Sequence, residues 1–223
     1  MLADGDAPTG SQLDAAWPGW SDGIEFVVAA DGGARHAVPL GLRVDTWVGD
    51  GDSVGDDALA ALASAGVDIR RVAAAKDESD TELAVAAALE RGADHIVVLG
   101  AFGGERFDHA IANVGLLAMP ALAGRSVELI DARTRVRLLR GPAAGGRAAA
   151  VDLPGRVGDV VSLLPFGPGV EGVTTEGLAY PLRDEPLPEG PARGLSNVRS
   201  SVDARVTVRR GLLLVIESPA TLA

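Results

Sequence analysis

The stretch Thr46-Trp47-Val48-Gly49-Asp50-Gly51-Asp52-Ser53 places two aspartates directly behind an apolar segment. Thr46–Val48 has the residue types of a short strand, and Asp50 and Asp52 follow its end with one glycine between them. Carboxylates at this spacing can reach one ion together, because the glycine leaves the loop free to bend. A solvated turn has a similar composition, so the stretch fits either a metal-binding loop or an ordinary turn.

Other acidic clusters in the first half of the chain also follow apolar runs or turn-like stretches. They are Ala30-Asp31-Gly32-Gly33, Lys76-Asp77-Glu78-Ser79-Asp80 and Gly103-Gly104-Glu105-Arg106-Phe107-Asp108-His109. Where parallel strands give way to loops, carboxylates can converge at one edge of the sheet and hold a hard cation such as Mg²⁺. Arg106 and His109 add the charge partners that a phosphate needs. The clusters together therefore predict metal–nucleotide chemistry.

The segment from Ile24 to Asp131 alternates short apolar runs with longer Ala- and Leu-rich stretches, which predicts β-α units and a mostly parallel sheet. The expected strands are Ile24–Ala29, Thr46–Val48, Ile69–Val72, Ile96–Leu99 and Val127–Ile130, and the expected helices are Asp56–Ala65, Ser79–Arg91 and Arg106–Ala118. Ser79 and Glu82 form a capping-box pattern that opens the second helix, and Gly92 closes it. Apolar residues at helical spacing predict that one face of the third helix packs on the sheet: Ala110, Ile111, Val114 and Leu117.

After about Asp131 the helical patterns end, and short apolar segments are interrupted by Gly, Pro and Thr. This half is predicted to be all-β, with strand-like sequence in Val157–Pro165, Gly169–Pro181 and Val202–Ile216. Residues 140–150 and 181–191 are expected to form loops. We therefore expect an α/β domain in residues 1–133 and an all-β domain in residues 134–223.

Composition narrows the class of protein. The chain has 223 residues, of which 47% are hydrophobic, and this suits one large folded domain or two small ones. The absence of cysteine excludes disulfides, thiolate metal sites and a cysteine nucleophile. The net charge of -11 argues against a general nucleic-acid binder. No apolar stretch approaches the roughly 20 residues of a membrane helix, and residues 1–10 lack a signal-peptide pattern, so we expect a soluble cytoplasmic protein.

Some of the cluster residues have two interpretations. Asp31 lies at the carboxyl end of an expected strand, where it either caps the next helix or lies at a ligand, with Gly32-Gly33 allowing a close backbone turn. Trp47 either covers the edge of the core or stacks on a substrate ring. Lys76 either reaches a phosphate or neutralises its acidic neighbours. His109 either moves a proton or is a structural hydrogen-bonding residue.

The remaining cluster residues favour anion and metal binding. Asp80 lies in the first turn of its helix, where the helix dipole stabilises the ionised form and a bound metal would do so further. Gly103-Gly104 can offer backbone N–H groups to an anion, and Arg106 can bind a phosphate bidentately. The chain contains neither a P-loop pattern nor a Gly-x-Gly-x-x-Gly fingerprint, so neither a P-loop nor a protein-kinase mechanism applies.

The four clusters, in this order and followed by an all-β half, closely resemble the thiamine pyrophosphokinase family over nearly the whole chain. Two segments of the second half, Glu176-Gly177-Leu178-Ala179-Tyr180-Pro181-Leu182 and Arg193-Gly194-Leu195-Ser196-Asn197, also look like the substrate segments of that family. The resemblance implies an N-terminal α/β domain with a mostly parallel sheet that binds Mg-ATP. It further implies a small C-terminal β-sandwich that forms the thiamine pocket at the interface of a homodimer.

Residue roles follow from the same resemblance. It implies that Asp50, Asp52 and Asp80 are the Mg²⁺ ligands and, with Arg106, the catalytic residues. It places Asp31, Arg106 and Asp108 at the nucleotide. Together with the other cluster residues, the expected nucleotide-binding set is Asp31, Gly32, Gly33, Lys76, Ser79, Gly103, Gly104, Arg106, Asp108 and His109. It places Ser196 and Asn197 at thiamine.

The chain departs from the family pattern at two positions. Glu105 is an extra residue between Gly104 and Arg106, so we expect the loop to bulge. Gly51 replaces the phenylalanine that commonly separates the paired aspartates, which loosens the loop or leaves room for another group. Neither departure removes an expected metal ligand.

The resemblance implies a thiamine diphosphokinase, which transfers diphosphate from Mg-ATP to the hydroxyl of thiamine and gives thiamine diphosphate and AMP. One alternative is a pyrophosphokinase for another acceptor, such as a hydroxymethyl pterin. Another is a non-catalytic, nucleotide-sensing module on the same fold. The complete set of Asp50, Asp52, Asp80 and Arg106 argues against the non-catalytic module, which would have no need of all of them.

Overall fold

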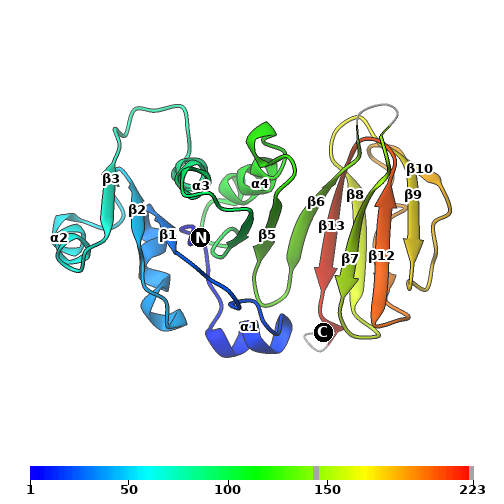
Figure 1. Cartoon of the computed structure of the whole chain (residues 1–223), viewed down its shortest axis with the longest axis horizontal. Helices are drawn as coiled ribbons and strands as arrows, with labels where there is room; N and C mark the ends of the chain where they lie inside the picture. The colour runs from blue at the N-terminus through cyan, green and yellow to red at the C-terminus, as the bar shows by residue number, and fades with distance from the viewer. Residues whose placement is uncertain (143–145, 221–223) are drawn as a thin grey trace. The chain divides into compact units, whose positions relative to one another are not determined.

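The structure is a computed structural model and describes residues 1–142 and 146–220 (Figure 1). The chain divides into two compact units, Met1–Ala132 and Arg133–Ala223. Unit 1 contains parallel strands and helices, and unit 2 is built from antiparallel strands. The predicted fold class is therefore confirmed.

Parallel strands form the sheet of unit 1. β1 (Val28–Ala30), β2 (Thr46–Gly49) and β3 (Asp68–Arg71) pair in that order, and β4 (His95–Val98) pairs with β5 (Ser126–Ile130). All of these pairs are parallel, as the alternation of apolar runs and helical stretches predicts. The carboxyl ends of β1 and β2 therefore carry Asp31 and Asp50 to the same edge of the sheet.

The first residues of the chain add a parallel link that the sequence analysis did not predict. Leu2 bridges Ala29 of β1 on one side and Leu99, just after β4, on the other. The Leu2 N–H donates to the Val28 carbonyl at 2.9 Å, and the Ala3 N–H donates to the Leu99 carbonyl at 2.8 Å. Leu2 thereby joins the two groups of parallel strands into one layer.

The helices of unit 1 are those predicted, with additions. They are α1 (Gly10–Ala16), α2 (Asp56–Ser64), α3 (Asp80–Glu90) and α4 (Phe107–Leu116), with 3₁₀ turns η1 (Asp31–His36), η2 (Val38–Leu40) and η3 (Pro120–Leu122). Helix α3 packs against β1 and β2, and α2 lies against β3 (Figure 1). Ser79 caps α3 by accepting the Glu82 N–H at 3.1 Å, as its sequence predicts.

Some local predictions for unit 1 are wrong. The strand expected from Ile24 begins only at Val28, because the Val27 N–H donates to the side chain of Asp45 at 2.8 Å and not to a neighbouring strand. Ile111 on α4 is 58% exposed, so it does not belong to the buried face predicted for this helix. Helix α1 was missed, although Thr9 and Gln12 form a complete capping box at its start.

Unit 2 is a sandwich of antiparallel strands. The strands are β6 (Arg135–Arg140), β7 (Ala149–Pro154), β8 (Val160–Pro165), β9 (Val170–Glu176), β10 (Glu185–Leu187), β11 (Asn197–Val198), β12 (Asp203–Val208) and β13 (Leu212–Ser218). One group pairs in the order β10-β9-β12-β7 and another in the order β11-β8-β13-β6. Apolar side chains from both groups form one core, which includes Leu153, Leu163 and Val206.

In this unit, one predicted loop contains a short strand and the other is described only in part. The Pro-rich stretch 181–191 contains the short strand β10, which pairs with β9. It therefore belongs partly to the sheet and is not a loop throughout. In the loop expected at 140–150, residues 143–145 lie outside the described residues, and β7 begins at Ala149.

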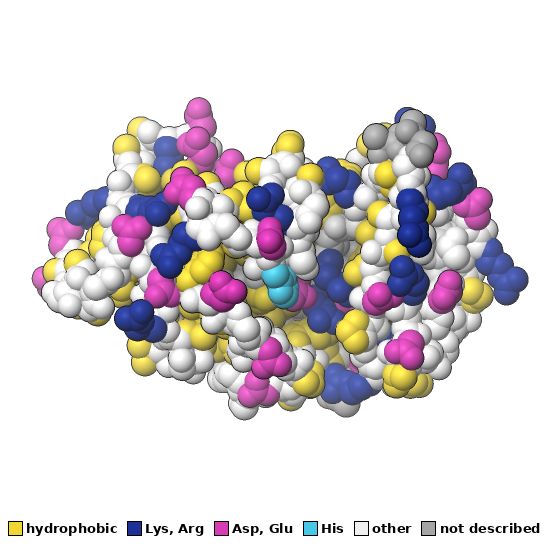
Figure 2. All heavy atoms as spheres, in the orientation of Figure 1, with side chains coloured by type: hydrophobic (Ala, Val, Ile, Leu, Met, Phe, Trp, Pro, Cys, Tyr) yellow, Lys and Arg dark blue, Asp and Glu magenta, His cyan; other side chains and the backbone are white. Residues whose placement is uncertain are grey.

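Both acidic and basic side chains lie at the surface of the described residues on the face shown in Figure 2. Within the described residues, no helix combines the length and the apolar character that crossing a bilayer requires.

A buried ion-pair group lies in unit 2. Arg199 and Glu217 are 1% and 2% exposed, and the Arg199 Nη2 lies 2.8 Å from Glu217 Oε2. The other Glu217 oxygen accepts from Arg135 Nε at 2.9 Å and from Arg137 Nη2 at 2.5 Å. Arg199 also donates to the Leu153 carbonyl on β7. This group therefore links β13, β6 and the segment after β11.

Replacing Glu217 with alanine should destabilise the protein, because the Arg199 guanidinium would stay buried without its counter-charge. We expect the free energy of unfolding to fall by about 3–5 kcal/mol in urea denaturation. Glu171→Ala is the control, since Glu171 is an exposed residue 3.9 Å from Arg210, and its loss should change stability by less than about 0.5 kcal/mol. Equal losses for the two variants would contradict the structural role of Glu217.

Candidate active site

Carboxylates of unit 1 meet where β1 and β2 end. Asp31, Asp50 and Asp52 each offer an oxygen, and these atoms lie within 4.8 Å of one another. Asp31 is buried, Asp50 is half-buried and Asp52 is exposed. The structure thus brings the paired aspartates of the second cluster together with the aspartate of the first.

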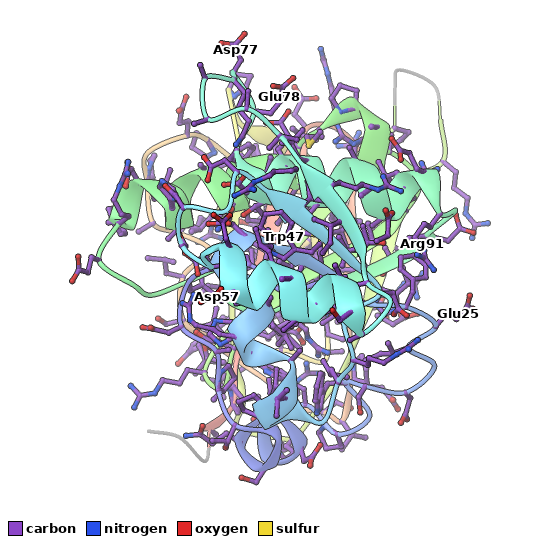
Figure 3. The ribbon with its side chains drawn as sticks, turned by 90° about the vertical axis from the view of Figure 1, so that its left-hand side faces the viewer. Glu25, Trp47, Asp57, Asp77, Glu78 and Arg91 are labelled. Carbon is purple, nitrogen blue, oxygen red and sulfur yellow. The ribbon has the colours of Figure 1, made fainter. Side chains whose placement is uncertain are left out.

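Asp31 is held in an uncommon backbone conformation. Its φ is 40°, in the left-handed region that few residues other than glycine adopt. The indole N–H of Trp47 donates to the Asp31 carbonyl at 2.9 Å, and Trp47 is fully buried inside unit 1 (Figure 3). A Cβ at Gly49 would lie 2.9 Å from the Asp31 Cβ. Trp47 is therefore a core residue that supports Asp31, and it does not stack on a substrate ring.

The loop after β2 is built around Gly51. Its N–H donates to Asp31 Oδ1 at 3.2 Å, and the Asp52 N–H donates to Asp50 Oδ1 at 3.0 Å. The Ser53 hydroxyl donates to Asp52 Oδ1 at 2.9 Å. These hydrogen bonds use one oxygen of each carboxylate and fix how the side chains face one another.

Lys76 and Asp80 lie next to this cluster. The Lys76 Nζ is 2.9 Å from Asp80 Oδ1 and 3.9 Å from Asp50 Oδ2, and the lysine side chain is only 14% exposed. Asp80 Oδ1 is buried and accepts no well-aligned hydrogen bond, although the ammonium is close. Lys76 therefore neutralises part of the acidic cluster in this structure. The assignment of Asp80 as a metal ligand remains a prediction.

The pKa values of the cluster move in opposite directions. Burial raises the pKa of Asp31, and the nearby Asp80 and Asp52 carboxylates raise it further, while a hydrogen bond with Ser53 offsets part of the rise. Hydrogen bonds with Ser53 and then with Asp31 lower the pKa of Asp52. Ionisation of Asp31 therefore costs free energy in the folded protein. Such a cost is expected where several carboxylates lie together at a site for one cation.

The donor set fits Mg²⁺. Oxygen ligands from one or two carboxylates, completed by water and substrate phosphate, are what this ion prefers. Asp31, Asp50 and Asp52 supply such oxygens at one place, and Asp80 has a further buried oxygen nearby. A divalent cation would offset the burial and the repulsion that raise the pKa of Asp31.

The segment Leu2–Asp6 also contacts the acidic clusters, although it was not predicted to do so. Asp4 pairs with Arg35, and the Asp6 carboxylate accepts the Gly104 N–H at 3.1 Å. His36 Nε2 contacts the Gly5 carbonyl at 2.8 Å. The segment therefore lies between the first and fourth acidic clusters. Asp4-Gly5-Asp6 after an apolar pair repeats the pattern of the other clusters, and this was the signal available in the sequence.

The fourth cluster is more exposed than the others. Gly103 and Gly104 have φ values of 75° and 74°, which bend the chain just before the extra residue Glu105. Arg106, the residue before α4, forms a pair with Asp108, with Nη2 2.5 Å from Oδ2. This contact lowers the pKa of Asp108 to about 2. Among the described residues, no hydrogen bond or ion pair joins Arg106 to the carboxylate cluster. One of the predicted backbone donors, the Gly104 N–H, is hydrogen-bonded to Asp6.

The expected thiamine residues lie in unit 2, beside a cavity of about 350 Å³. Leu163, Leu182, Tyr180 and Asn197 are among the residues that line it. The Asn197 side chain accepts the Tyr180 N–H at 3.0 Å and donates to the Tyr180 carbonyl at 2.6 Å. The Asn197 side-chain amide thus fixes the backbone of Tyr180, which lines the cavity.

Ser196 has a more local role in the structure. Its φ is 55°, and its backbone N–H donates to the Ser162 hydroxyl at 3.0 Å. The contact with Ser162 fixes the turn that leads into β11. Ser196 therefore adjoins the residues that line the cavity, and its assignment to thiamine remains a prediction.

The raised pKa of Asp31 yields a stability prediction. The folded protein binds the Asp31 proton more tightly than the unfolded chain does, so stability falls as the pH rises through the folded-state pKa. Asp31→Asn removes the carboxylate and with it this loss of stability. The variant keeps a side-chain oxygen that can accept the Gly51 N–H. In metal-free protein at pH 7 we expect the Tm to rise by about 2–4 °C. A lower Tm would contradict the proposed cost of ionising Asp31, and equal shifts at pH 4 and pH 7 would contradict the pH dependence of this cost.

Comparison with known proteins places these features in a family. A sequence model described as "Thiamin pyrophosphokinase, catalytic domain" matches residues 20–129, and one described as "Thiamin pyrophosphokinase, vitamin B1 binding domain" matches residues 150–213. The chain is 26% identical over 200 residues to "Thiamine pyrophosphokinase" of Bacillus subtilis (strain 168), covering 90% of each protein.

Solved structures share this fold. The crystal structure of thiamine pyrophosphokinase from Bacillus subtilis matches with a TM-score of 0.80 at 23% identity, covering 97% of this chain and 96% of that one. The enzyme structure from Geobacillus thermodenitrificans matches with a TM-score of 0.76 at 26% identity, covering 97% and 94%. The matched domains follow one another in the order of the two structural units, and the chain belongs to the thiamine pyrophosphokinase family.

Proposed function

We propose that the protein is a thiamine diphosphokinase, which transfers the terminal diphosphate of Mg-ATP to the primary hydroxyl of thiamine. The products are thiamine diphosphate and AMP. The observation that carries this proposal is the convergence of Asp31, Asp50 and Asp52 within the region matched by the catalytic-domain model. The match of a vitamin B1 binding domain to residues 150–213 supports thiamine as the acceptor.

The acidic cluster would hold the metal–nucleotide complex. Asp50 and Asp52, with Asp80 as implied by the family resemblance and Asp31 as suggested by the geometry, are the residues proposed to bind Mg²⁺. When bound, Mg²⁺ neutralises charge on the phosphate oxygens. The other proposed nucleotide-binding residues are Gly32, Gly33, Lys76, Ser79, Gly103, Gly104, Arg106, Asp108 and His109.

In the proposed reaction, the thiamine hydroxyl oxygen forms a bond to the β-phosphorus of ATP. The bond from that phosphorus to the oxygen shared with the α-phosphate breaks, and AMP leaves. One carboxylate of the cluster accepts the hydroxyl proton. Two cations are proposed to stabilise the phosphates: Lys76, which is close to Asp50 and Asp80, and Arg106, whose side chain is 67% exposed.

Unit 2 would bind thiamine. We propose that the cavity lined by Tyr180 and Asn197 accepts it, with Ser196 at its side. We also propose a homodimer in which this pocket lies at the subunit interface, as the resemblance implies. Tyr180 and Leu195 line the cavity and are 70% and 46% exposed, the kind of apolar surface that a second subunit covers.

Asp52→Asn should abolish turnover and leave the fold intact, because Asp52 is exposed and its loss removes a charge from the cluster but no core contact. Formation of AMP and thiamine diphosphate from Mg-ATP and thiamine should fall below about one per cent of the wild-type rate. Circular dichroism checks the fold of the variant.

Asp57→Asn is the matched control for this change. Asp57 is an exposed aspartate in the first turn of α2, outside the cluster (Figure 3). Its replacement should leave turnover near the wild-type value. Near-normal activity of Asp52→Asn would refute its assignment as a metal ligand.

Asn197→Ala should weaken thiamine binding, because the variant loses both hydrogen bonds that hold the Tyr180 backbone at the cavity. We expect the KM for thiamine to rise about tenfold, with the KM for Mg-ATP unchanged. Ser201→Ala also loses a side chain–backbone hydrogen bond in unit 2, to Asp203, but does not line the cavity, so its KM values should not change. A rise in both KM values for Asn197→Ala would argue against a local role.

A further inference from the structure

We propose that Arg71 is a positioning residue for the metal loop, defined as Asp50–Ser53. Its guanidinium fixes the backbone of this loop from the neighbouring strand. The inference rests on the proposed function, because the loop matters only if its aspartates bind a metal ion. It assigns no contact between Arg71 and the substrate.

Arg71 contacts the first residue of the metal loop and the first residue of α2. It is the last residue of β3 and lies opposite Gly49, the last residue of β2, in the parallel register. Its Nε donates to the Asp50 carbonyl at 3.2 Å, and its Nη2 donates to Asp56 Oδ1 at 2.8 Å. Asp56 is the first residue of α2, so one guanidinium ties the start of the loop to the start of the next helix.

The position of Arg71 depends on the glycine between the paired aspartates. Gly51 has a φ of 88°, and a Cβ built on it would lie 2.9 Å from Leu59 Cδ1 and 3.0 Å from Arg71 Nη2. Arg71 and Leu59 therefore occupy the space that a side chain at position 51 would need. The glycine at position 51, where the family commonly has phenylalanine, thus leaves room for the Arg71 guanidinium.

Electrostatics alone would not favour an arginine at this place. A positive charge next to a cation site opposes binding of the cation, and the Asp56 carboxylate offsets only part of that charge. The planar guanidinium can, however, donate to two acceptors in fixed directions, which an ammonium group cannot do. We therefore infer that Arg71 contributes through the geometry of the loop. Loss of a positioning residue should weaken binding of the cation, whereas loss of a merely repulsive charge should strengthen it.

The test is titration of Mn²⁺, as a probe for Mg²⁺, into the full-length protein without nucleotide, followed by electron paramagnetic resonance of the unbound ion. Arg71→Lys keeps the charge and loses the two-pronged contact, and Arg71→Gln loses both. A positioning role predicts that the Kd for Mn²⁺ rises about tenfold in both variants. A purely electrostatic role predicts no change for Arg71→Lys and tighter binding for Arg71→Gln.

Arg70 provides the matched control. It is the adjacent residue of β3, and its guanidinium pairs with Asp68 and Glu90, neither of which belongs to the metal loop. Arg70→Lys and Arg70→Gln should leave the Kd for Mn²⁺ unchanged. Asp56→Glu keeps the charge but shifts the carboxylate that accepts from Arg71, so it should also raise the Kd for Mn²⁺. This variant tests the inference if the Arg71 variants do not fold.

The outcomes separate this inference from the proposed function. Wild-type affinity in Arg71→Lys and Asp56→Glu would overturn the positioning role while leaving the metal site in place. Tighter binding by Arg71→Gln would likewise overturn it. Failure of the wild-type protein to bind Mn²⁺ would overturn the metal site and this inference together.

Discussion

The pairing of Leu2 with Ala29 and Leu99 is the constraint on which the acidic edge depends. It places one strand-like segment between β1 and the residue after β4, so the loops that follow these elements emerge side by side. Backbone atoms approach closely here, since a Cβ at Gly33 or at Gly100 would collide with the carbonyl oxygens of Leu2 and Ala3. Gly33 of the first cluster and Gly100, which precedes the fourth cluster, thus allow this segment to pack closely.

The acidic cluster is held in place by hydrogen bonds from the surrounding fold, although its carboxylates repel one another. Asp31 is buried with a left-handed backbone, and Trp47 and Gly51 hold it through hydrogen bonds. The neighbouring carboxylates oppose its ionisation, and Lys76 offsets only part of their charge. Such an arrangement reduces stability in the metal-free state and is typical of a site shaped for a bound cation.

Much of this organisation could be predicted from the sequence because the local signals agree. Short apolar runs between helical stretches located β2 to β5, and the Ser79 cap located the start of α3. The Leu2 strand was missed because Met1-Leu2-Ala3 is too short to show a period, although Leu2 and Ala3 are fully buried and Leu2 pairs on both sides. The approach of Arg71 to Gly51 could not be predicted, since it depends on the register of β2 against β3.

The most direct measurement of the central claim is AMP release by the purified protein from Mg-ATP, with and without thiamine, together with identification of thiamine diphosphate by mass. The account predicts that AMP and thiamine diphosphate appear in equal amounts, and only when metal, ATP and thiamine are all present. A folded protein that releases no AMP under these conditions would contradict the account.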